Sequence, residues 1–78
     1  MNPEPYAYGT RITLTPGGRH ELLDAYVVDH NKTTGEYRYR CIFPYKGSAM
    51  WGNVYSSEIQ ETRYVDEDET ARLMEVTR

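Results

Sequence analysis

The chain has 78 residues, a net charge of −3 and one cysteine. A chain of this length forms one domain at most, and it leaves little room for a deep active site beside a core. Eight tyrosines and one tryptophan contribute to the 38% of residues that are hydrophobic. We expect a folded domain with a small core, because disordered chains combine few aromatic residues with a high net charge.

Several classes of protein are disfavoured by what the sequence lacks. No apolar run approaches the roughly 20 residues of a membrane span, and residues 1–9 resemble no secretory signal. Cys41 has no partner for an internal disulfide, which suits a reducing cytosol. Cys41, His20 and His30 are too few and wrongly spaced for structural zinc. We therefore expect a cytoplasmic protein with no membrane contact, no metal and no cofactor.

The charges are unevenly distributed along the chain. Residues 1–60 carry six basic and six acidic side chains, so the whole net charge of −3 lies in residues 61–78. A neutral body is poor evidence for strong nucleic-acid binding, which depends on neutralising phosphates.

The first half of the chain predicts two strands after an irregular start. Ile12 and Leu14 alternate with polar residues, as in a half-buried strand. In the next strand the alternation slips between Ala25 and Val28, which indicates a bulge or a bend. The predicted segments are an irregular lead-in at 1–9, a strand at 10–15, a loop at 16–21 and a strand at 22–30.

The second half predicts three more strands and a terminal helix. In the third strand four residues share one face, and Arg38 and Arg40 share the other. Asp66 can cap a helix, with Glu69 three positions later. The predicted segments are a turn at 31–35, a strand at 36–43, a loop at 44–52, a strand at 53–55, a helical turn at 56–59, a strand at 61–65 and a helix at 66–78.

Short strands joined by glycine-bearing turns indicate a small barrel or sandwich. The order of GTRITL, the bent LLDAYVVD, EYRYRCIF, WGNVY and the turn SSEI resembles an SH3-like barrel of the Tudor or KOW type over residues 9–65. The resemblance implies an all-β, five-stranded SH3-like barrel with the helical turn before its last strand, followed here by a short C-terminal helix. The chain also looks like the small accessory proteins of bacteriophages.

One cluster of side chains is the main candidate for binding. Its members are aromatic or large and flexible, of the kinds enriched at protein interfaces: Tyr45, Met50, Trp51 and Tyr55. The resemblance to Tudor domains implies that such residues could form a cage for a methylated lysine or arginine. The alternative is structural, with Trp51 capping the core and the tyrosines half-buried in the barrel.

Arg38 and Arg40 are the second candidate site. Interleaved with tyrosines, they could follow a nucleic-acid backbone while bases stack. The alternative is a solvated face on which they pair with Asp24, Asp29 or Glu36 across strands.

The sequence offers no identifiable catalytic machinery. Cys41 falls on the tyrosine face and is expected to be a small core residue. The glycines at 17 and 18 lack the lysine and helix of a phosphate loop.

We therefore expect a non-enzymatic module that binds another protein, with Trp51 as the anchor and Arg38 and Arg40 at the rim. If the gene is viral, the partner would be a host protein whose activity is modulated. One alternative is nucleic-acid binding across the Arg38/Arg40 face. The other is a structural, self-associating subunit, in which apolar residues of a loose helix contact a second copy: Leu73, Met74 and Val76.

Overall fold

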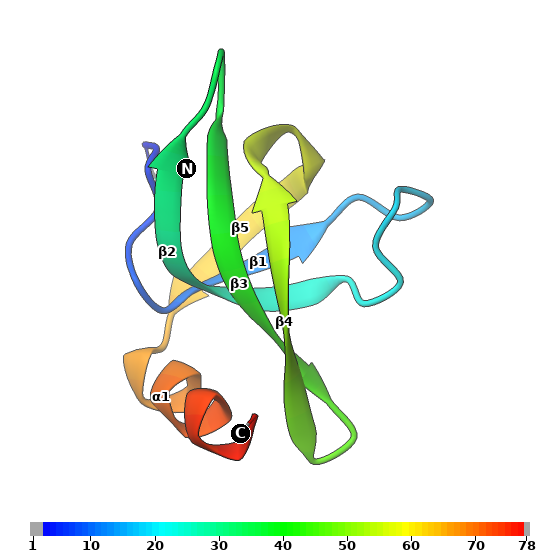
Figure 1. Cartoon of the computed structure of the whole chain (residues 1–78), viewed down its shortest axis with the longest axis vertical. Coiled ribbons are helices and arrows are strands. Elements are labelled where there is room, and N and C mark those ends of the chain that lie inside the picture. The colour runs from blue at the N-terminus through cyan, green and yellow to red at the C-terminus, as the bar shows by residue number, and fades with distance from the viewer. Residues whose placement is uncertain (1–2, 78) are drawn as a thin grey trace.

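The computed structural model describes residues 3–77 and consists of an antiparallel sheet with one short helix at its C-terminal end (Figure 1). The elements are β1 (Thr10–Leu14), β2 (Asp24–Lys32), β3 (Tyr37–Tyr45), β4 (Ser48–Tyr55), the 3-10 turn η1 (Ser56–Glu58), β5 (Ile59–Val65) and α1 (Glu67–Val76). The five strands lie in the order β4-β3-β2-β1-β5. This confirms the predicted fold class, a mainly β domain with a short C-terminal helix. The strand order, with η1 between the last two strands, is compatible with an SH3-like fold.

The predicted irregularity in β2 is present. The register between β2 and β3 shifts between Val27 and Asp29, so one residue bulges out of the ladder. Three successive residues before the bulge are buried, because the strand packs on both sides there: Ala25 and Val27 face the inner core, and Tyr26 belongs to a second apolar cluster.

The predicted loop at 44–52 is wrong, because these residues form a tight hairpin. β3 extends to Tyr45 and β4 begins at Ser48, directly opposite. The two residues between them, Lys46 and Gly47, have φ values of 49° and 78°. Positive φ at both central positions is the signature of a type I′ turn, whose twist matches that of paired strands. The candidate residues at 45, 50 and 51 therefore lie on paired strands and not in a loop.

The inner face of the curved sheet encloses the main core. The side chains that share this interior are Ile12, Leu14, Ala25, Val27, Tyr39, Cys41, Phe43 and Val54. Residues 3–9 contain no strand, yet they close one end of this core. Tyr6 stacks on Tyr39 with ring centroids 5.3 Å apart, and the Tyr39 hydroxyl donates a hydrogen bond to Glu4 at 3.0 Å. Burial is the largest cause that raises the pKa of the Tyr39 hydroxyl.

Helix α1 packs on the outer face of the sheet. Asp66 caps it as predicted, because its carboxylate accepts a hydrogen bond from the Glu69 N–H at 3.0 Å. Leu73 is 1% exposed and packs with Tyr26, Ile42 and Ala49. The burial of this side chain within its own chain removes it as a contact for a second copy.

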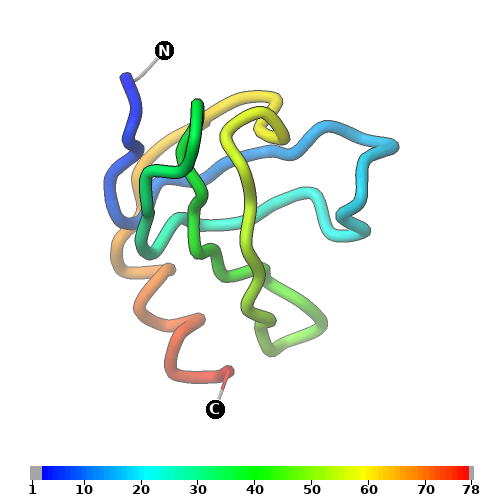
Figure 2. The backbone as a smooth tube through the Cα atoms, turned by 45° about the horizontal axis from the view of Figure 1, so that its top comes forward, coloured from blue at the N-terminus to red at the C-terminus, as the bar shows by residue number. Residues whose placement is uncertain are grey.

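The remaining two residues of the predicted self-association patch differ from each other. Met74 is partly buried against the same cluster as Leu73, whereas Val76 is 40% exposed. Figure 2 shows the helix at the end of the molecule that carries the β3–β4 turn, with the β2–β3 turn at the opposite end. Within residues 3–77, no helix is long and apolar enough to cross a membrane.

Candidate functional site

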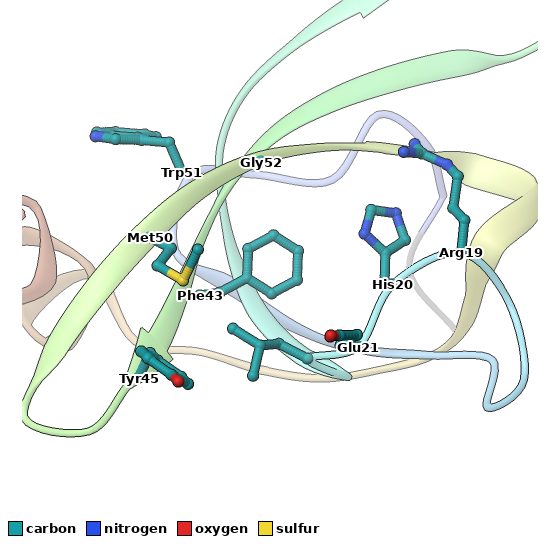
Figure 3. A pocket seen from close by; sticks show the side chains of 9 residues that line it. Arg19, His20, Glu21, Phe43, Tyr45, Met50, Trp51 and Gly52 are labelled. Carbon is teal, nitrogen blue, oxygen red and sulfur yellow. The ribbon is translucent and has the colours of Figure 1, made fainter.

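The four residues of the predicted aromatic cluster divide between the two faces of the β3–β4 hairpin. Side chains alternate along a strand, so Met50 lies on the inner side and Trp51 and Tyr55 on the outer side. Tyr45 lies opposite Ser48 and shares the inner side with Met50. In Figure 3 the Trp51 side chain extends away from Tyr45, Met50 and Phe43. The four side chains therefore do not enclose a single cage.

On the outer face, Trp51 and Arg40 form the main contact. The guanidinium carbon of Arg40 lies 4.4 Å from the centre of the Trp51 ring, a cation–π arrangement. Trp51 is 38% exposed and so does not cap the core. Arg38 lies on the same face, opposite Tyr55.

The three carboxylates that were candidates to neutralise these arginines have other partners. Asp24 lies 3.6 Å from Arg11. Asp29 accepts a hydrogen bond from the main-chain N–H of His30 at 2.8 Å. Glu36 accepts one from the main-chain N–H of Ser57 at 2.9 Å, which is the largest cause that lowers the pKa of its carboxyl.

The two arginines consequently present their charge outward. Across residues 3–77, no ion pair joins Arg38 or Arg40 to a carboxylate. Both side chains are exposed. The outer face beside Trp51 is therefore a small cationic surface with an aromatic platform in it.

On the inner side, the hairpin and the β1–β2 connection form an open groove of about 520 Å³ (Figure 3). The ring of Phe43 lies in this groove, and His20 stacks against it with ring centroids 5.8 Å apart. Gly52 allows the ring to approach β4, because a Cβ at that position would lie only 2.7 Å from a Phe43 ring carbon. The other apolar residues that line the groove are Leu22, Tyr45, Met50 and Trp51, although the Trp51 side chain extends away from it (Figure 3).

The far wall of the groove is held in place by Glu58 of η1. Its carboxylate accepts hydrogen bonds from the Arg19 guanidinium at 2.6 and 3.0 Å and from the Tyr55 N–H at 2.8 Å. The ring nitrogen Nε2 of His20 lies 3.3 Å from the same carboxylate. Burial by itself raises the pKa of the Glu58 carboxyl, but these hydrogen bonds outweigh it and hold that pKa below its usual range. The β1–β2 connection is thus tied to the end of β4.

Most of these groove residues were not predicted from the sequence. Arg19, His20 and Leu22 lie in an irregular connection, and their position depends on the contact with Glu58. That contact joins residues 39 positions apart, and no local pattern signals it.

Two observations describe groups that can carry chemistry in proteins, a thiol and possible metal ligands. Cys41 is fully buried as predicted, and burial raises the pKa of its thiol to about 12. Among residues 3–77, no three His, Cys, Asp or Glu side chains lie close enough together to hold a metal ion.

Comparison with protein-family models, with curated proteins and with solved structures gave no match to this chain. Its function must therefore be inferred from the residues and their geometry alone.

Proposed function

We propose that this domain is a non-enzymatic binding module that recognises another protein through its β3–β4 hairpin. The observation that carries the proposal is the exposure of Trp51 beside Arg40. A tryptophan buries a large area at low entropic cost, and tryptophan and arginine dominate the energetics of protein interfaces. Trp51 lies on a strand that is paired with β3, and its ring already contacts Arg40, so less conformational freedom is lost when a partner binds.

The exposed apolar surface of the hairpin supports the same function. Tyr45 is 40% exposed and Met50 50%, and these two side chains lie together on the inner side of the hairpin, beside the groove. Exposed apolar groups gathered in one place mark interaction sites more often than scattered ones do.

We further infer that the domain is an SH3-like barrel of the Tudor type. The strand order and the η1 turn support this assignment. In such a barrel the β1–β2 connection and the β3–β4 hairpin lie side by side, as they do around the groove here.

The test begins with capture of the partner by the tagged domain from a cell lysate, with and without nuclease. Trp51→Ala is then compared with Tyr64→Ala, which removes an exposed aromatic side chain from β5. We expect Trp51→Ala to weaken binding of the purified partner by at least about 2 kcal/mol, or roughly 30-fold, while the circular dichroism spectrum is unchanged. Equal effects of the two variants would refute the proposal.

A second candidate function is binding of single-stranded nucleic acid by the outer face. Two observations favour it: within residues 3–77 no carboxylate forms an ion pair with Arg38 or Arg40, and Arg40 stacks on Trp51. This function predicts an affinity for fluorescent oligonucleotides that falls steeply with salt and is lost in Arg38→Glu. Binding that is insensitive to salt, or no binding to either DNA or RNA, would remove it.

A further inference from the structure

The open edge of β4 offers main-chain hydrogen-bonding groups. β4 lies at one edge of the sheet, and within residues 3–77 the only strand that pairs with it is β3. Two contacts show which residues have main-chain groups that point outward, that is, away from β3. The Asn53 carbonyl accepts a hydrogen bond from Arg19 at 3.0 Å, and the Tyr55 N–H donates one to Glu58 at 2.8 Å. Because the main-chain groups of a strand alternate in direction, those of Trp51 point outward as well.

The two halves of this edge differ in whether their main-chain groups already have hydrogen-bond partners. Near its C-terminal end, the side chains of Arg19 and Glu58 occupy main-chain groups that another strand could use. Further toward the hairpin, the N–H and C=O of Trp51 have no neighbouring strand within the described residues. The open stretch thus comprises the N–H and C=O of Trp51 and the N–H of Asn53, because α1 packs against β4 at Ala49 and receives a hydrogen bond from Ser48. Unprotected edges of this kind are templates for an added strand.

The two sides of the open stretch differ in chemistry. The inner side is the apolar groove over Phe43, with Leu22 and Met50 beside it. On the outer side, the Arg40 guanidinium reaches from β3 across to the Trp51 ring and has no carboxylate partner within residues 3–77. A strand added at this edge would place successive side chains alternately over an apolar groove and beside a positive charge.

We propose that the edge of β4 binds an extended peptide segment in which apolar residues alternate with acidic ones, added to the sheet as a sixth strand. This inference rests on the proposed function and specifies its partner. The main chain of the peptide bonds to Trp51 and Asn53, its apolar side chains enter the groove, and its carboxylates face Arg40. A single chain fits better than a second folded copy, because the Arg19–Leu22 segment stands beside the same edge.

The first experiment selects ligands from an array of blocked random peptides of about seven residues. We expect the bound sequences to alternate apolar and acidic residues. A blocked peptide alternating isoleucine with glutamate then serves as the soluble probe. At saturation it slows exchange of the Trp51 amide proton by about tenfold or more, because that proton gains a hydrogen bond. The amides of Met50 and Gly52 point toward β3 and serve as internal controls.

Two substitutions at one position test the main-chain contact. Asn53→Pro removes one outward N–H without removing a bond to β3, and Asn53→Ala keeps that N–H. We expect Asn53→Pro to weaken the probe about fivefold and Asn53→Ala to leave its affinity within about twofold. If Asn53→Pro fails to fold, the Trp51 amide measurement on the unsubstituted protein decides the question.

A charge exchange tests the outer contact. Arg40→Glu should weaken the glutamate-containing probe by about tenfold or more and should favour the corresponding isoleucine–lysine peptide instead. An unchanged preference, or probe binding without protection of the Trp51 amide, overturns the inference. The inference is also overturned if the array selects no peptide, or if two copies of the chain form a dimer through the β4 edge instead. In that case, binding of a folded partner that still depends on Trp51 would leave the proposed function standing. Failure of both peptide binding and Trp51-dependent partner binding would refute the proposed function together with this inference.

Discussion

Replacement of Leu73 by alanine tests whether α1 is an integral part of the domain. The Leu73 side chain is 1% exposed and contacts Tyr26, Ile42 and Ala49 on the outer face of the sheet. Leucine-to-alanine changes in cores cost about 2–5 kcal/mol. Leu73 lies on a ten-residue helix on the outer face of the sheet, which can shift to fill part of the space. We therefore expect a loss of about 2.5 kcal/mol in the free energy of unfolding.

For a domain of this size that loss lowers the melting temperature by about 10–20 °C. Thermal unfolding followed by circular dichroism measures it, with Val76→Ala as the control. Val76 is 40% exposed on the same helix, so its truncation should change the stability by about 0.5 kcal/mol or less. A melting temperature for Leu73→Ala within about 3 °C of the control would show that the helix does not anchor to the sheet through this side chain.

Three further predictions concern the groove wall, the core and the hairpin turn. Although burial raises the pKa of Glu58, the hydrogen bonds from Arg19, Tyr55 and His20 together outweigh it, so the native carboxyl has a lowered pKa. Its stabilising effect is therefore full above the ordinary glutamate pKa and is lost as the pH falls through the lowered one. Urea unfolding from about pH 5 to pH 3 should accordingly show a weaker loss of stability in Glu58→Gln than in the unsubstituted protein. Cys41 is fully buried with a thiol pKa of about 12, so a thiol reagent should modify it only as fast as the protein opens; rapid modification of the native state would contradict its burial. Gly47→Ala should lower the free energy of unfolding by about 1 kcal/mol, because its φ of 78° is strained for alanine although a Cβ there meets no atom within 4 Å. Lys46→Asn should be neutral or stabilising, because asparagine tolerates a positive φ better. Chemical denaturation of both variants measures the difference.

The parts of the fold that local patterns determine were predictable. Strict alternation placed Tyr39, Cys41 and Phe43 inside and Arg38 and Arg40 outside. The slip in the alternation of the second strand marked the bulge, and the spacing of Asp66 and Glu69 marked the start of the helix.

The hairpin that carries the candidate site was not predictable in the same way. β4 uses both faces: Ala49 packs under the helix, Met50 borders the groove and Trp51 lies on the outer face. Apolar residues therefore occur in succession and the period of two disappears. The turn itself has Lys46 where asparagine, aspartate or glycine is the usual signal. The groove depends further on the pairing of Arg19 with Glu58, which only the folded chain brings together.

Binding through the β3–β4 hairpin can be tested by mapping the contact surface of the captured partner on the isotopically labelled domain by nuclear magnetic resonance. If the domain binds through the β3–β4 hairpin, the largest shift changes upon binding occur at the indole and amide signals of Trp51 and along β3 and β4. Changes centred on β5 or on residues 3–9, with the Trp51 signals unaffected, would contradict it.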